Sequence, residues 1–137
     1  MDREVIAGKL ESLRRCYNRI QEKCPPGAEQ LVSDIDAQDI LTLNLTRAVQ
    51  LCVDLASHLV AGSDAMPPTT MGQAFDLLAD AGTISHDLAQ RMKRAVGFRN
   101  IAIHNYGVIN WHVVHAIATR HIDDFKVFAK AVESFSF

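Results

Sequence analysis

Residues 36–60, DAQDILTLNLTRAVQLCVDLASHLV, decide the fold of this chain. Apolar residues recur there at alternating steps of four and three, which is the spacing of one face of an α-helix. A second apolar row widens that face, so we expect a central and deeply buried helix. Asp36 is the expected N-cap, and Asp39 adds negative charge to the first turn. The two rows are Leu41, Leu45, Ala48, Cys52, Leu55 and Leu59, and Val49, Val53, Ala56 and Val60.

The same spacing predicts three further long helices. The first ends at the Pro25-Pro26-Gly27 triplet, because proline cannot continue a helix and glycine accepts the left-handed turn. The next begins after the N-cap Ser85 and is broken by residues 105–110. The last is expected over residues 111–135, with the apolar stripe Trp111, Val114, Ala118, His121, Phe125, Phe128 and Val132.

Two short helices complete the expected architecture. One is predicted at residues 28–33, and the other at residues 71–81, between the N-cap Thr70 and the terminating Gly82. The sequence has no strand alternation with hairpin turns, no internal repeat and no low-complexity tract. We therefore expect an all-α, up-and-down bundle of four long helices plus one or two short ones, in a single domain over residues 1–137. The wide apolar stripes also leave room for a dimer interface.

Composition is that of an ordinary globular protein, with 48% apolar and 22% charged residues. No apolar run approaches the roughly 20 residues that span a bilayer, and the charged start MDRE argues against a signal peptide. Cys16, Cys24 and Cys52 are odd in number and lack C-x-x-C spacing, so we interpret them as reduced core thiols rather than metal or redox groups. These features predict a cytoplasmic protein without a membrane span.

Charge is unevenly distributed along the chain. The net charge is −2, yet residues 88–122 contain no acid, while five of the 14 Lys and Arg and four of the six histidines lie there. A local positive field on an acidic body suits a polyanion bound at one site, although chance segregation in a short chain is the alternative. Within this window, Arg91, Lys93 and Arg94 are either a solvated face or, if an active motif lies beside them, an RNA-steering patch.

The segment Phe98-Arg99-Asn100-Ile101-Ala102-Ile103-His104-Asn105-Tyr106 is the candidate for chemistry. One more helical step beyond Leu88, Met92 and Ala95 reaches Arg99, so a cation falls where an apolar residue is expected. A buried guanidinium is costly unless it is paired or faces a groove. We expect Arg99 to line a cleft; the alternative is a stem laid on the core with its head in water.

His104 strengthens the functional interpretation. It follows Asn100 by four residues, so the amide can orient the imidazole from the same helical face. Arg99 and His104 lie five apart, about 140° around an ideal helix, and do not easily converge. Either the helix distorts near its end, or a second copy of the chain completes the site. Tyr106 lies just past the helix, before Gly107, where we expect an exposed phenol.

These residue types suit the cleavage of RNA. The reaction needs a group that moves a proton at the 2′-hydroxyl or the leaving oxygen, which a histidine near neutrality can do. It also needs stabilisation of negative charge on phosphorus, which the arginine fork provides because it matches phosphate oxygens. This chemistry requires no metal and no cofactor.

The pattern R-N-x-x-x-H resembles the signature of the HEPN superfamily, whose helical members include many metal-independent RNases. The longer string Phe98-Arg99-Asn100…His104-x-Tyr106 is similar to its HepT-type toxin branch, as are Ala74-Phe75-Asp76-Leu77-Leu78, Ala81-Gly82, Leu88-Ala89…Met92 and Val96-Gly97. The resemblance covers about residues 5–128 and is most specific over residues 70–107. It implies a HEPN-like bundle with Arg99, Asn100 and His104 as catalytic residues.

The resemblance also implies two partners. One is a second copy of the chain, with both motifs facing one cleft. The other is a minimal nucleotidyltransferase antitoxin of a type VII-like toxin–antitoxin system, which neutralises members of this branch by transferring AMP to the motif tyrosine, here Tyr106. From position alone, Tyr106 equally fits a ring that packs on Trp111 and anchors the turn. Asn105 stands where many relatives have an acid, which removes a charge beside the base but no group that the chemistry requires.

The histidines His112, His115 and His121 have the spacing H-x2-H-x5-H. No cysteine or carboxylate lies close enough in sequence to complete a metal set, the nearest being Asp123 and Asp124. We therefore interpret them as ordinary helix histidines and expect no metal site, with His121 in the core or at an interface.

Three functions remain open from the sequence. The favoured one is a ribonuclease toxin, for which the intact Arg99, Asn100 and His104 set is the discriminating feature. The second is a non-catalytic helical substrate-binding partner of a nucleotidyltransferase. The third is an unrelated helical dimerisation domain in which the motif is accidental.

Overall fold

The computed structural model describes residues 3–64 and 66–135, and in that part of the chain all regular structure is helical. The residues Met1 and Asp2, which the sequence assigns to a charged start, lie outside it. The elements in chain order are α1 (Arg3–Lys23), α2 (Ala28–Val32), α3 (Ile35–Ala61), α4 (Gln73–Asp80), α5 (His86–His104), the 3-10 turn η1 (Tyr106–Val108), α6 (Trp111–Arg120) and α7 (Ile122–Glu133).

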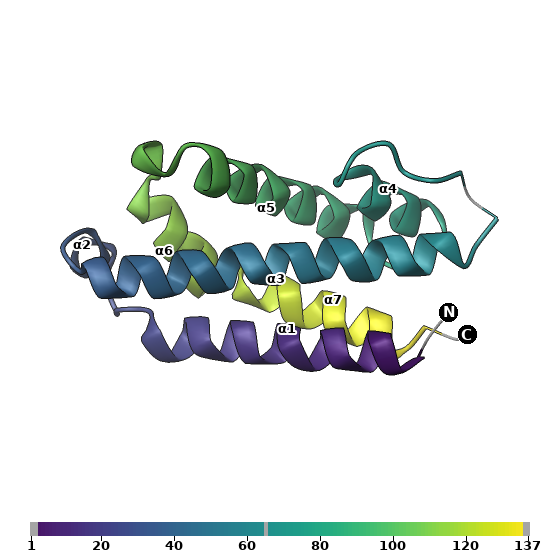
Figure 1. Ribbon diagram of the computed structural model, residues 1–137, viewed down its shortest axis with the longest axis horizontal. Helices are drawn as coiled ribbons and strands as arrows, with labels where there is room; N and C mark the ends of the chain where they lie inside the picture. Colours follow the sequence, from purple (N-terminus) through teal and green to yellow (C-terminus); the bar gives the residue numbers. More distant parts are fainter. Residues whose placement is uncertain (1–2, 65, 136–137) are drawn as a thin grey trace.

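Helix α3 is the centre of the bundle, as its double apolar row predicts. It contacts each of the other six α-helices (Figure 1). All ten residues of the two predicted rows are buried, and six of them, including Leu41, Leu45 and Cys52, are fully inaccessible. Phe75 of α4 and Phe128 of α7 meet edge to face with ring centroids 5.6 Å apart, and both side chains are fully buried in the core.

Successive long helices run up and down the bundle (Figure 1). The end of α5, η1 and the start of α3 therefore meet at the same end of the molecule, together with α2. The start of α1 and the end of α7 lie toward the opposite end. This arrangement brings the candidate motif of residues 98–106 against a part of the chain about 65 residues earlier in sequence.

Two predicted helix starts are wrong by two residues. The N-cap of α3 is Asp34 and not Asp36, because the Asp34 carboxylate accepts the Ala37 amide proton at 3.0 Å. Helix α4 begins at Gln73 rather than at residue 71, although Thr70 Oγ1 still accepts the Gln73 amide proton at 3.2 Å. Several capping side chains cluster at each start, and the sequence does not rank them.

The predicted start of α5 and the predicted glycine stop after α4 are confirmed. The hydroxyl of Ser85 accepts the Leu88 amide proton at 3.0 Å and caps α5. Gly82 has a φ of +80° just past α4, the only positive φ among the described residues. This left-handed turn, in which Thr83 N donates to Leu78 O, is the helix stop that glycine adopts at low cost.

The predicted long helix over residues 111–135 is wrong, because it is two helices that break at His121. No proline or glycine marks the break. Asp123 and Asp124 occupy the first turn of α7, where negative charge favours a helix start. The break lets α6 lie against α2 and α3 while α7 turns to lie against α1 and α5.

No helix in the described residues is both long enough and apolar enough to span a membrane. All three cysteines are free, with Cys16 and Cys52 buried and Cys24 partly so. Burial, and then the nearby Cys16, raise the pKa of the Cys52 thiol well above its ordinary value of 9.0. These thiols are packed into the core, as the sequence predicts.

Candidate functional site

The motif occupies the last turn and a half of α5 and the turn that follows. The helix is continuous to His104, and Asn105 N closes it by donating to Ile101 O at 2.8 Å. The helix therefore does not distort to bring Arg99 and His104 together. Of the two ways to complete the site that the spacing leaves open, the continuous helix removes the first.

Arg99 is partly buried, with its guanidinium beside the segment that leads into α4. Its Nη1 donates to Asn100 Oδ1 at 3.2 Å and approaches Met71 Sδ at 3.9 Å. Its Nε is buried and has no hydrogen-bond partner among the described residues. A charged donor left without a partner in a partly buried side chain is poorly explained by packing, and the guanidinium keeps hydrogen-bonding capacity that an anionic ligand can use.

His104 is exposed at the end of α5. The predicted support by Asn100 is not present, because the amide oxygen accepts from Arg99 and no hydrogen bond joins Asn100 to His104. The imidazole is thus free to meet an outside group, and Asn100 orients the guanidinium instead.

Tyr106 begins η1, and three groups surround its side chain. Its hydroxyl donates to Asp39 Oδ1 at 3.0 Å, and its ring meets Trp111 edge to face, with centroids 5.9 Å apart. The residue is nevertheless 45% exposed. Partial burial, and then the hydrogen bond and charge of Asp39, raise the pKa of the Tyr106 phenol, whereas the nearby Thr42 hydroxyl lowers it. The phenol is therefore neutral, packed at its ring against Trp111 and hydrogen-bonded at its oxygen to Asp39.

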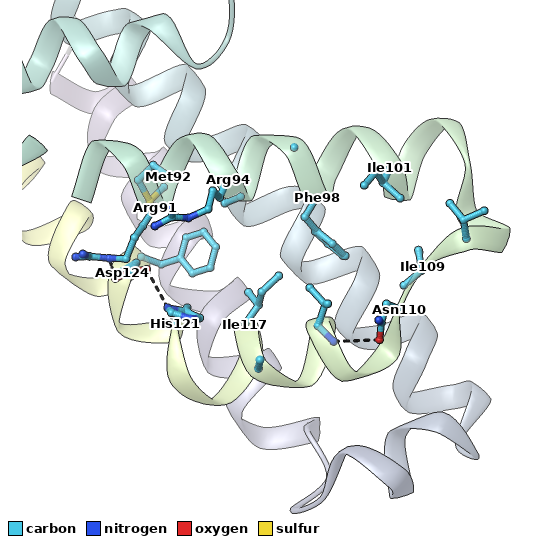
Figure 2. A pocket seen from close by; sticks show the side chains of 16 residues that line it. Arg91, Met92, Arg94, Phe98, Ile101, Ile109, Asn110, Ile117, His121 and Asp124 are labelled. Carbon is cyan, nitrogen blue, oxygen red and sulfur yellow. Dashed lines mark hydrogen bonds and ion pairs between the residues drawn. The ribbon is translucent and has the colours of Figure 1, made fainter. Parts of the chain in front are cut away.

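An apolar groove of about 650 Å³ lies beside the motif, between α5 above and α6 and α7 below (Figure 2). Phe98 and Ile117 point into it from opposite walls. No Cα atoms of α5 and α6 approach within 8 Å, so the groove is a gap that this chain does not close. Its lining is almost entirely apolar, with Arg94, His121 and the Arg91–Asp124 pair at one end.

Nearly half of the exposed large apolar side chains lie around this groove and the motif. Among the described residues, eleven such side chains are exposed, and five of them fall within residues 101–113. A monomer with this much exposed apolar surface in one place has an unmet packing partner. These five are Ile101, Ile103, Tyr106, Val108 and Val113.

The predicted basic patch is mostly neutralised by partners from other helices. Arg91 Nε pairs with Asp124 at 2.9 Å, and Lys93 Nζ pairs with Asp76 at 2.9 Å. Arg94 is exposed and is in no ion pair within the described residues. Of the three residues suggested for RNA steering, only Arg94 keeps its charge free.

The three histidines of α6 and its end do not form a metal site, and no group of three ligand side chains gathers in residues 3–64 or 66–135. His112 Nε2 lies 3.1 Å from Glu29 Oε1, and His115 Nε2 lies 2.9 Å from Pro25 O, so both tie α6 to the region around α2. His121 is not in the core, one of its two expected places: it is exposed at the helix break, 3.7 Å from Asp124. Its other expected place, an interface, stays a prediction.

Two features were missed from the sequence. The first is the hydrogen bond from Tyr106 to Asp39, which an aspartate near a helix start does not indicate by itself. The second is a groove between α1 and α3 lined by Arg15, Arg19 and Arg47. A count of arginines on the polar faces of both helices would have indicated the second feature, because the two helices pack side by side.

An all-helical bundle with an R-N-x-x-x-H motif at the end of one helix and a tyrosine just beyond it defines the HEPN toxin class. The family model described as ribonuclease HepT-like matches residues 13–132. The chain therefore belongs to the ribonuclease HepT-like family.

Curated and solved relatives agree with this assignment. The mRNA nuclease HepT of Shewanella oneidensis is 32% identical over 131 residues, which are 96% of this chain and 98% of that protein. A solved structure of the tri-AMPylated HEPN toxin of Shewanella oneidensis, in complex with its MNT antitoxin, has a TM-score of 0.90 at 32% identity. The match covers 98% of this chain and 100% of the toxin chain.

Two further solved structures extend the comparison. A toxin–antitoxin structure with AMP-PNP has a TM-score of 0.90 at 31% identity and covers 96% of this chain and 99% of the matched chain. The cytosolic protein YutE of Bacillus subtilis has a TM-score of 0.83, covering 97% of this chain and 89% of YutE, at only 14% identity. At that identity the likeness concerns the fold alone.

Proposed function

We propose that this chain is the ribonuclease toxin of a type VII-like toxin–antitoxin pair, acting in the cytoplasm as a single-domain, metal-independent endoribonuclease. The observation that carries the proposal is the Arg99 Nε, a buried charged donor with no partner, five residues from an exposed histidine. A phosphate oxygen is the acceptor that such a donor fits. The family membership and the mRNA nuclease relative support the same reaction.

In this mechanism His104 moves a proton at the 2′-hydroxyl or at the leaving oxygen of RNA. Arg99 stabilises the charge that develops on the phosphoryl oxygens as the bond breaks. Asn100 holds the guanidinium in orientation through its 3.2 Å hydrogen bond. Arg94, with its charge free at the end of the groove, is the remaining residue of the basic patch suited to steer RNA toward the motif.

The active form is a homodimer. Arg99 and His104 diverge on a regular helix, so each site needs a group from a second copy of the chain. The apolar groove and the exposed side chains of residues 101–113 supply the surface on which that copy packs. The two motifs then face one cleft, and the RNA lies across it.

Control of the toxin comes from a minimal nucleotidyltransferase antitoxin that transfers AMP to Tyr106. The relative from Shewanella oneidensis is described as AMPylated and in complex with an MNT antitoxin. In this chain Tyr106 is 45% exposed and lies two residues from His104. An adenylate there adds a negative charge and bulk at the mouth of the cleft, and both oppose the binding of RNA.

The test is cleavage of RNA by purified protein in EDTA. The His104→Ala variant should lose about 10²-fold or more of the activity, the usual scale for a general acid or base. The matched control is His86→Ala, which removes an exposed histidine from the other end of the same helix and should cleave normally. Equal activity of His104→Ala and the native chain would refute the site, and a fully inactive native chain would favour the non-catalytic partner of a nucleotidyltransferase.

A further inference from the structure

The hydroxyl of Tyr106 donates a hydrogen bond to Asp39 at 3.0 Å, although the two residues lie 67 positions apart in the sequence. Asp39 is exposed on the second turn of α3 and is in no ion pair within the described residues. A carboxylate that accepts a hydrogen bond from a nucleophilic hydroxyl is well placed to take the proton of that hydroxyl when it reacts. The aspartate belongs to this chain and not to the enzyme that would modify it.

We propose that Asp39 is a catalytic residue for the modification of its own chain: it accepts the Tyr106 proton when AMP is transferred to the phenol. The inference rests on the proposed function, in which Tyr106 is the acceptor. The Tyr106 oxygen bonds to the α-phosphorus of ATP, the bond between the α-phosphorus and the bridging oxygen breaks, and pyrophosphate leaves. The proton passes from the phenol to Asp39 and then to water, so the step balances without any oxidant or reductant.

Thr42, one turn after Asp39, supplies the second part of the argument. Its hydroxyl is buried, with the residue only 7% exposed, and has no hydrogen-bond partner among the described residues. Thr42 follows Asp39 by three residues on α3, so the two side chains lie on the same face of the helix. Once the proton has moved to Asp39, the Thr42 hydroxyl can donate to the phenolate and so gain the hydrogen-bond partner that it lacks.

The geometry also leaves room for the nucleotide. The Tyr106 ring packs against Trp111, its hydroxyl bonds to the exposed Asp39, and the residue as a whole stays 45% exposed. An aspartate in this position orients the attacking hydroxyl and takes its proton late, which is the role that such residues have in phosphoryl transfer. Because both residues are exposed, the active site of a nucleotidyltransferase can close over them without opening the bundle.

The experiment compares rates of adenylate formation on the full chain, followed by intact mass. The modifying enzyme is a minimal nucleotidyltransferase antitoxin of the kind that the proposed function requires, supplied with ATP and Mg²⁺. Asp39→Asn keeps an oxygen that accepts from the phenol but removes the proton acceptor, so we expect the rate to fall about 10²-fold or more. Asp39→Glu keeps a carboxylate in poorer geometry and should recover part of the rate.

A purely structural role predicts the opposite order, with Asn close to the native rate and Glu worse. The matched control is Asp36→Asn, an exposed aspartate in the first turn of α3 that does not contact Tyr106. It should be modified at the native rate. Thr42→Val, which removes the unpartnered hydroxyl, should slow the transfer several-fold without lowering the melting temperature.

The outcomes separate the inference from the function on which it rests. Adduct formation at the same rate on the native chain and on Asp39→Asn overturns the role of Asp39 and leaves Tyr106 as the acceptor. No adduct on the native chain, or an equal adduct on Tyr106→Phe, overturns the proposed control by AMP transfer and the inference with it.

Discussion

Replacement of Arg99 by methionine tests whether the guanidinium is there for structure or for chemistry. Methionine keeps most of the apolar stem that lies along the core side of α5, and it removes the charge and all five donors. In the native chain the head makes one hydrogen bond, to Asn100, and a long contact to Met71 Sδ, while its Nε stays buried and unpartnered. The substitution therefore removes little that holds the fold together.

The expected change in the free energy of unfolding follows from those contacts. Leaving Nε buried without a partner costs about 1–3 kcal/mol, which the variant recovers. The lost hydrogen bond to Asn100 lies at the surface and contributes about 0.5–1.5 kcal/mol. We expect Arg99→Met to be as stable as the native chain or more stable by about 1 kcal/mol. Its RNA cleavage should nevertheless fall about 10²–10³-fold, the scale for removing a group that stabilises transition-state charge.

Urea unfolding, followed by circular dichroism, measures the first quantity, and cleavage of a fluorescently labelled RNA measures the second. The matched control is Arg120→Met, which removes an exposed arginine from the end of α6 and should change neither. A loss of 2 kcal/mol or more in Arg99→Met would show that the guanidinium supports the fold. Unchanged cleavage in a stable variant would remove Arg99 from the active site.

Three further outcomes are expected. Phe128→Ala should lower the free energy of unfolding by about 3–5 kcal/mol, because the ring is fully buried against Phe75; a loss below 1 kcal/mol in urea titration would contradict this packing. Ile101→Asp, a change at an exposed position beside the groove, should yield a folded but inactive monomer in analytical ultracentrifugation; an active dimer would place the interface elsewhere. The buried Cys52 thiol should resist DTNB in the native state. Because the pKa of this thiol is raised in the folded protein, its contribution to the free energy of unfolding is fully present below pH 9.0 and is lost as the pH rises further. Free energies of unfolding that stay constant between pH 8 and 11 would contradict that.

The buried rows of the bundle could be predicted because burial on a helix follows a period that the sequence displays directly. Leu41, Leu45 and Cys52 are inaccessible for the same reason that they recur at steps of four and three. The break at His121 could not be predicted in this way, because the apolar stripe continues through it and no helix-breaking residue marks it. The change of direction comes from packing against two different sets of helices, which a local pattern does not contain.

In the candidate site too, the sequence predicts the local features but not the tertiary contacts. Sequence spacing places Asn100 and His104 on one face, but it does not say that the amide will bond to the adjacent Arg99 instead. It identifies Arg91 and Lys93 as basic, but not that Asp124 and Asp76, which lie on other helices, pair with them. Residue type and helical face are local properties, whereas partners belong to the tertiary structure.

Tyr106 shows why two interpretations that exclude each other in sequence can both describe one side chain. The sequence leaves the ring either packing on Trp111 or carrying a modification, because position alone supports both. The structure shows the packing contact at 5.9 Å between ring centroids and, at the same time, a hydroxyl bonded to Asp39 on a residue that is 45% exposed. Packing involves the ring, and modification involves the hydroxyl oxygen. A ring that already packs on Trp111 loses less conformational entropy when a modifying enzyme binds it than a mobile ring does. The packing contact therefore also prepares the phenol for AMP transfer.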